Sequence, residues 1–195
     1  LSLMLQIVDL PEWAAIARPA WPLLVIGYWA LYAPAAPALA ADVARLRFGV
    51  VSCSSYAHGF FNAYRQLAQR NDLDVVLHLG DYIYEYGTGE YGTVRPYEPA
   101  NEITTLADYR TRHNYYKRTD ADLREAHRHT PWITIWDDHE FANNAYMDGA
   151  ENHNTATQGS WVDRKNTAAR VYHEWMPIRT PDPSALDKIY RSFDF

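Results

Sequence analysis

Three short apolar runs, each followed by polar residues, divide the middle of the chain. They cover residues 47–52, 73–79 and 132–136, and they are rich in β-branched, aromatic and other large apolar residues. Runs of this length and composition are typical of buried strands in a parallel sheet. Between the first two runs, residues 59–70 place apolar side chains at helical spacing. The pattern therefore predicts a strand–helix–strand unit with a right-handed crossover.

Three further segments are preceded by residues that cap helices well, and the last segment ends at Pro177. They cover 106–117 after Thr104 or Thr105, 121–128 after Asp120, and 161–176 after Ser160. The final residues, 188–195, alternate between apolar and polar side chains and predict one more strand.

The first 44 residues have a different character. The apolar run 21–32 follows Arg18 and precedes Ala38-Leu39-Ala40, which is a small-x-small pattern. This arrangement predicts either an export signal or an apolar strand or helix followed by the Ala/Pro linker 33–38. The run is too short, and too interrupted by proline, to predict a stable membrane span, and it contains no twin-arginine pair. We expect a leader or linker over 1–44 and an ordered domain over 45–195.

Composition narrows the range of partners. The formal net charge is −6 and the pI is about 5.7, so no nucleic-acid-binding surface is expected. The 15 tyrosines and 7 tryptophans suit an aromatic core, or a cleft that faces aryl or sugar groups. Cys53 is the single cysteine, which excludes an intrachain disulfide and leaves the compartment open. Residues 110–129 are locally basic, which predicts a solvated helix face or a rim that steers an anionic substrate.

The second apolar run ends in Gly80-Asp81, with Tyr84 three residues later. Glycine permits a tight turn and a close approach of backbone atoms. Ligands of open α/β sheets bind beyond the carboxyl ends of the strands, so we expect Asp81 and Tyr84 to face a ligand.

The third apolar run ends in Asp137-Asp138-His139-Glu140. This string on its own is also compatible with the acidic first turn of a helix. Burying several neighbouring acids is costly unless a cation or hydrogen bonds compensate their charge. Two acidic strand ends at one sheet edge favour a two-metal centre with a bridging carboxylate. His139 would then stabilise developing charge or protonate a leaving oxygen.

Several blocks of this sequence, in order, resemble the PhoD-like phosphatases, which belong to the calcineurin-like metallophosphoesterase superfamily. The first blocks are Ser52-Cys53, Gly80-Asp81-Tyr82-Ile83-Tyr84-Glu85 and Trp136-Asp137-Asp138-His139-Glu140-Phe141-Ala142-Asn143-Asn144. Two further blocks are Gly149-Ala150-Glu151-Asn152-His153 and Tyr172-His173-Glu174-Trp175-Met176-Pro177-Ile178-Arg179. The resemblance covers residues 45–195, and it implies an α/β fold in which two mixed β-sheets form a sandwich flanked by helices.

The resemblance also implies roles for individual residues. Cys53, Asp81 and Tyr84 would bind Fe³⁺, and Asp81 would bridge to Ca²⁺. Asp138 stands where the superfamily usually has asparagine and would bind the second ion, while His139 would act on the phosphoryl oxygens or the leaving group. A thiolate and a phenolate suit a trivalent ion, and carboxylates suit calcium. Without the resemblance, Cys53 would be interpreted as an inert thiol and Tyr84 as a ring lining a cleft.

The function implied by the resemblance is hydrolysis of phosphate monoesters or diesters by a metal-bound hydroxide, with a small phosphate ester or phosphodiester as substrate. An export signal within 1–44 would place the protein in a periplasmic or extracellular compartment. The superfamily also has later metal-binding blocks that this sequence lacks. The alternative is therefore a truncated, non-catalytic fragment that binds metal. A nucleotide-binding domain is disfavoured because no phosphate-cradling glycine loop follows the first strand.

Overall fold

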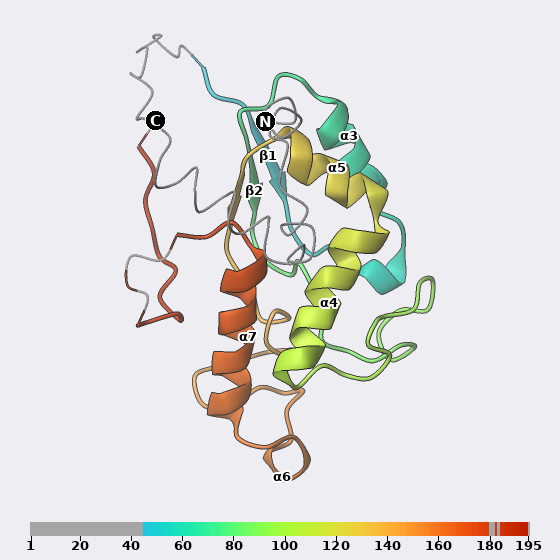
Figure 1. Cartoon of the computed structure of the whole chain (residues 1–195), viewed down its shortest axis with the longest axis vertical. Helices are drawn as coiled ribbons and strands as arrows, with labels where there is room; N and C mark the ends of the chain where they lie inside the picture. Colours follow the sequence, from blue (N-terminus) through green and yellow to red (C-terminus); the bar gives the residue numbers. More distant parts are fainter. Residues whose placement is uncertain (1–44, 180–181, 183, 195) are drawn as a thin grey trace, which may run out of the picture. The chain divides into compact units, whose positions relative to one another are not determined.

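A parallel sheet of three strands organises the part of the chain that the computed structural model describes, which is residues 45–179, 182 and 184–194. Residues 1–44, where we expected a leader or linker, lie outside this part. The strands are β1 (Phe48–Val51), β2 (Val75–His78) and β3 (Trp132–Thr134), in the spatial order β1-β2-β3. β2 pairs with both neighbours in parallel, and Figure 1 shows β1 and β2 side by side. All three strands lie within the runs predicted for them.

The helices of the described residues are η2 (Tyr56–His58, a 3-10 turn), α3 (Asn62–Gln69), α4 (Leu106–Thr119), α5 (Ala121–His129), α6 (Thr155–Gln158) and α7 (Trp161–Trp175). Helices α3, α4, α5 and α7 follow the predicted segments closely, and the short helices η2 and α6 were not predicted. Thr105 and Asp108 form a reciprocal capping box at the start of α4. Asp120 caps α5 and Ser160 caps α7, each by accepting a backbone N–H hydrogen bond. These caps satisfy amides that a helix start leaves without partners.

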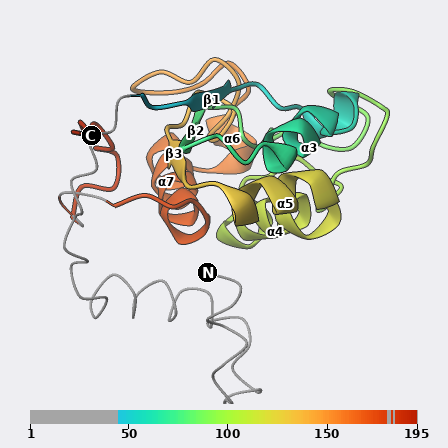
Figure 2. The ribbon, with the colours of Figure 1, turned by 90° about the horizontal axis from the view of Figure 1, so that it is seen from above.

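Helices α3, α4 and α5 lie on one side of the sheet (Figure 2), and α7 packs against α4. On this covered face the indole of Trp132 stacks against Tyr64 of α3 at 5.8 Å between ring centroids and against His127 of α5 at 3.9 Å. His113 of α4 stacks against Tyr82 at 6.1 Å. The helices therefore bury an aromatic core against one face of the sheet.

Three histidines belong to this interior, and we refer to them as the interior histidines: His78, His113 and His127. Burial lowers their pKa values, to about 4 for His78, about 3 for His113 and about 2 for His127. The cations of Lys117 and Arg112 lower the pKa of His113 further. All three side chains are therefore neutral at pH 7.

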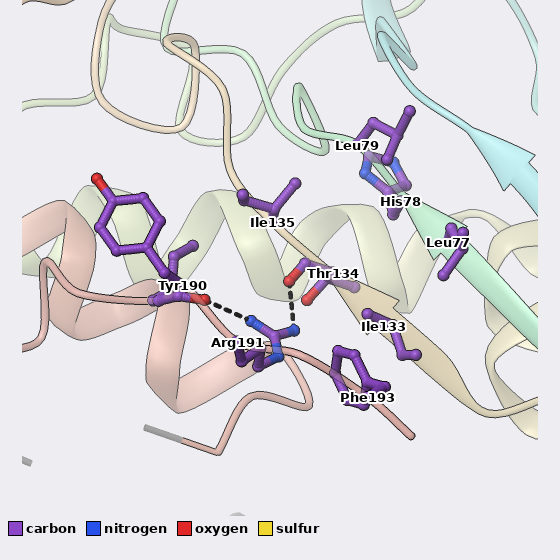
Figure 3. A pocket seen from close by; sticks show the side chains of 10 residues that line it. Leu77, His78, Leu79, Ile133, Thr134, Ile135, Tyr190, Arg191 and Phe193 are labelled. Carbon is purple, nitrogen blue, oxygen red and sulfur yellow. Dashed lines mark hydrogen bonds between the residues drawn. The ribbon is translucent and has the colours of Figure 1, made fainter. Parts of the chain in front are cut away.

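The opposite face of the sheet carries a row of apolar side chains. Val50, Leu77 and Ile133 are register partners across the three strands, and Val50 is 59% exposed. A groove of about 270 Å³ lies on this open face (Figure 3). One wall of the groove comes from residues 189–193, where Arg191 donates hydrogen bonds to the carbonyls of Thr134 (2.6 Å) and Ile189 (3.1 Å).

The predicted strand over 188–195 is not formed in its described residues, so that prediction was wrong. The side chain of Arg191 donates a hydrogen bond to the carbonyl of Thr134 in β3, and the described residues of 188–194 form no backbone hydrogen-bond ladder with that strand. The α/β class is correct. Of the two sheets that the family resemblance implies, the described residues hold one. Within the same described part, no helix combines the length and the apolar character needed to cross a membrane.

The basic region 110–129 fits neither interpretation completely. Arg112 is fully buried and donates hydrogen bonds to the backbone carbonyls of four residues between 84 and 101. Other cations of the region are paired, since Arg110 contacts Glu174 at 2.6 Å and Arg118 contacts Glu98 at 2.6 Å. Arg112 therefore holds a long loop in place and is neither solvated nor part of a rim.

Candidate metal centre

The loops that follow β2 and β3 are in direct contact at the carboxyl edge of the sheet. Gly80 has φ +107, and a Cβ atom there would lie 2.5 Å from both the backbone nitrogen and the Cβ of Asp137. Such a distance is a steric clash, so only glycine lets the two loops approach this closely. The close contact between the two loops therefore requires the glycine that precedes Asp81.

Three of the predicted residues meet where these loops touch. One potential ligand atom from each of Asp81, Asp138 and His139 lies within 4.8 Å of the other two. Asp81 is almost fully buried, and its Oδ1 atom has no hydrogen-bond partner among the described residues. Its Oδ2 atom accepts a hydrogen bond of 3.3 Å from the hydroxyl of Tyr84. A buried carboxylate oxygen without a partner is costly, and a cation is one way to compensate it, so these residues fit a metal ion.

The electrostatics of Asp81 support this interpretation. Burial raises the pKa of Asp81, and the charges of Asp138 and Asp137 raise it further, while the charge of His139 opposes the shift. Several acids therefore share a small volume in which their negative charges repel one another. A bound cation would reverse the sign of this local field.

Cys53 lies on the loop after β1, beside Asp81. Its backbone N–H donates to the carbonyl of Gly80 at 3.1 Å, and its thiol is exposed. A hydrogen bond from Ser52 lowers the pKa of the thiol, but burial and the charges of Asp81 and Asp137 outweigh it and leave the pKa raised. Cys53 does not belong to the group of ligand atoms formed by Asp81, Asp138 and His139.

Tyr84 is buried between Asp81 and His139. Its ring centroid lies 4.4 Å from that of His139. Burial and the nearby charge of Asp81 raise the pKa of Tyr84 far above its ordinary value. Without a cation the phenol therefore stays protonated, and ligation of a metal would require the metal itself to stabilise the phenolate.

Glu85 fixes the orientation of His139. The Nδ1 atom of His139 lies 2.8 Å from a carboxylate oxygen of Glu85, and both side chains are buried. The other oxygen of Glu85 accepts hydrogen bonds from the backbone N–H of Asn143 (2.7 Å) and the side chain of Asn152 (2.9 Å). Burial lowers the pKa of His139, but the hydrogen bond and charge of Glu85 outweigh it and leave the pKa raised. Nδ1 is thus occupied, and Nε2 is the nitrogen left for chemistry.

Glu140 joins the two acidic loops through hydrogen bonds to their backbone amides. Its buried carboxylate accepts backbone N–H groups from Asp81 (3.0 Å), Tyr82 (2.5 Å) and Asp137 (2.8 Å). Burial raises the pKa of Glu140 to about 8, against the opposing effect of these donors. One side chain therefore satisfies amides at the ends of both β2 and β3.

An aromatic wall, formed by Tyr84, Tyr86 and Tyr91, stands beside His139. Tyr91 stacks on Tyr84 at 5.5 Å and on Tyr86 at 4.7 Å, and its ring centroid lies 5.8 Å from that of His139. Tyr91 is 38% exposed. Arg112 holds the loop that carries this wall through its hydrogen bonds to the loop carbonyls. Part of the high tyrosine content is therefore next to the candidate centre, while much of the rest is in the core.

The predicted residues all lie at one edge of the sheet. Asp81, Asp138 and His139 form one group, and Cys53 and Tyr84 each adjoin Asp81. Their roles as ligands or catalysts stay predictions. Sequence reasoning missed Glu85 and Glu140, although each is an acid that directly follows a predicted site residue, and that position was the available signal.

Comparisons with known proteins agree with the resemblance seen in the sequence. The family model described as PhoD-like phosphatase matches residues 48–195. Alkaline phosphatase D of Bacillus subtilis (strain 168) is 43% identical over 165 residues, which cover 82% of this chain and 27% of that protein. A solved structure described as "Structure of PhoD" is 42% identical in sequence and has a TM-score of 0.66. The match covers 75% of this chain and 28% of the chain in that structure. This chain thus spans little more than a quarter of the length of either relative.

Proposed function

Since the chain belongs to the PhoD-like phosphatase family, we propose that its candidate metal centre hydrolyses phosphate monoesters or diesters. The observation that carries the proposal is the unpaired, buried Oδ1 atom of Asp81 beside Asp138 and His139. A cluster of acids with an orphaned oxygen at the carboxyl edge of a parallel sheet suits metal-assisted hydrolysis.

We propose Fe³⁺ and Ca²⁺ as the two ions. Cys53, Asp81 and Tyr84 would hold Fe³⁺, because a thiolate and a phenolate suit a trivalent ion. Asp138 would hold Ca²⁺, which prefers oxygen ligands, and Asp81 would bridge to it. When bound, the ions would polarise the phosphoryl group and activate the attacking water.

The residues of the chain have complementary tasks. His139 can hold a proton at Nε2, where it can stabilise charge on a phosphoryl oxygen or protonate the leaving oxygen. Glu85 keeps the imidazole in this orientation through Nδ1. Asp138 is itself oriented, because its Oδ2 atom accepts the backbone N–H of Asn144. The exposed ring of Tyr91 offers a surface for the organic part of the ester.

The substrate that we propose is a small phosphate ester or a phosphodiester. The proposed compartment is periplasmic or extracellular, and it is supported by the apolar run 21–32 and the following Ala38-Leu39-Ala40.

The test is metal analysis of the purified 195-residue chain, together with its visible spectrum and its turnover of p-nitrophenyl phosphate and bis-p-nitrophenyl phosphate. Ferric thiolate and ferric phenolate absorb visible light, so a colourless protein without iron would exclude the Fe³⁺ assignment. Asp81→Asn should abolish turnover, and Asp187→Asn, which changes an exposed acid, should leave it unchanged. Bound metal without turnover of either ester would instead support the non-catalytic fragment.

A further inference from the structure

Cys53 and Asp81, on the loops after β1 and β2, both adopt an unfavourable backbone conformation. Cys53 has φ 55 and Asp81 has φ 56, which is the left-handed region. For residues other than glycine this conformation costs about 1 kcal/mol or more, and it persists only where the surroundings hold it. Two backbone hydrogen bonds join the loops, from Cys53 N to Gly80 O and from Ser54 N to Asp81 O, both 3.1 Å long.

A chain of side-chain hydrogen bonds joins the same two loops through the interior. The backbone N–H of Gly80 donates to Nδ1 of His78 at 3.3 Å. Because Nδ1 accepts, the proton of the neutral imidazole is on Nε2, which donates to the hydroxyl of Tyr64 at 3.2 Å. The hydroxyl groups of Tyr64 and Ser54 share a further hydrogen bond of 2.5 Å, in which either hydroxyl can donate. The hydrogen bonds thus connect Gly80 to Ser54 without a break.

Both side chains in the middle of this chain are fixed by packing. His78 is fully buried and Tyr64 is nearly so. Trp132 of β3 stacks against both rings, at 5.8 Å from Tyr64 and 5.9 Å from His78, with interplanar angles of 27° and 20°. An ordered pair of this kind transmits the position of one loop to the other.

We propose that Tyr64 and His78 are positioning residues, which set the distance between the thiol of Cys53 and the carboxylate of Asp81. The proposal rests on the proposed metal centre. His78 is the last residue of β2, and its hydrogen bonds lead to both ligand-bearing loops. Partners behind a metal ligand typically affect metal affinity by about 10- to 100-fold.

Tyr64→Phe is the sharpest test, because it removes one oxygen and keeps the stacked ring. The matched control is Tyr116→Phe, since Tyr116 is equally buried and its hydroxyl has no hydrogen-bond partner in the described part of the chain. Co²⁺ is the probe: it binds thiolates and gives a charge-transfer absorption. We expect Tyr64→Phe to weaken Co²⁺ binding about tenfold and to shift or reduce that absorption. The control should change neither.

Ser54→Ala removes the other end of the chain from a half-buried position, and it keeps the proposal testable if Tyr64→Phe fails to fold. The double variant should bind Co²⁺ as well as the weaker single variant, because both changes break the same connection. Unchanged affinity and absorption in both single variants would overturn the positioning role and leave the proposed function intact. Failure of the unaltered chain to bind Co²⁺ would refute the centre itself, and the positioning role with it.

Discussion

Asp81→Asn is expected to stabilise the metal-free protein and to abolish its stabilisation by metal. Asparagine keeps the shape of the side chain and retains an acceptor for the hydroxyl of Tyr84. It also tolerates the left-handed backbone at φ 56. The change therefore removes a charge with little disturbance of the packing.

The magnitude follows from the geometry of the cluster. The ligand atoms of Asp81 and Asp138 lie within 4.8 Å of each other. At an effective dielectric constant of about 20, two unit charges at that distance repel by roughly 3.5 kcal/mol. The charge of His139 and the nearby solvent offset part of this repulsion, which leaves a gain of about 1–2 kcal/mol. For a domain of this size, that gain raises the melting temperature by about 3–6 °C.

The assay is thermal unfolding followed by calorimetry, first with a chelator and then with added Ca²⁺. A metal at 100 times its dissociation constant stabilises the folded state by about 2.7 kcal/mol, so the melting temperature of the unaltered chain should rise. The variant should show no rise. A variant that is less stable than the unaltered chain under chelation, or that gains as much from metal, would refute the reasoning about Asp81. Asp187→Asn, at an exposed acid, serves as the control in both conditions.

Three further predictions concern the groups around the centre. The interior histidines have depressed pKa values when folded and bind protons near pH 6.5 when unfolded, so stability should fall as the pH drops below about 6.5. In urea titrations at pH 7, 6 and 5, His113→Phe should reduce the pH dependence of the unfolding free energy by up to about 1.4 kcal/mol per pH unit. An unchanged pH dependence would argue against a buried neutral His113. Glu85→Gln should lower kcat about 10- to 100-fold with little effect on KM, because His139 loses its charged partner. Steady-state kinetics with wild-type values would show that Glu85 does not orient His139 for catalysis. Gly80→Ala should cost at least 1 kcal/mol more than Gly89→Ala in urea unfolding. Both glycines have positive φ, but a Cβ at position 89 meets no atom of the described residues within 4 Å. Equal losses of stability would contradict the close contact of the loops.

Local patterns in the sequence predicted most of the secondary structure. The apolar runs give β1, β2 and β3, and the side chains of Thr105, Asp120 and Ser160 mark helix starts because capping depends on residues only three positions apart. Parallel pairing followed from the length of the crossover. These features depend on neighbours along the chain, and the sequence displays such neighbours directly.

The roles of Glu85 and Glu140 could not be predicted in the same way. Glu85 contacts His139 across 54 positions, and Glu140 accepts hydrogen bonds from Asp81 and Tyr82 across 59 and 58 positions. From a local pattern alone, an acid is interpreted as a solvated residue or as a metal ligand. In this fold, backbone amides distant in the sequence determine the role of the acid. Arg112 was misread for the same reason, because its carbonyl partners lie on a loop at least 11 positions away.

The open face of the sheet has a consequence for any experiment in solution. Phe48, Val50, Leu79 and Ile135 are each at least 38% exposed on or directly beyond the strands. Exposed apolar side chains gathered on one face favour association between molecules and binding of apolar dyes. The purified chain should therefore lose monomer as its concentration rises. Metal stoichiometry and turnover should be measured over a range of protein concentrations, so that association is not mistaken for a property of the centre.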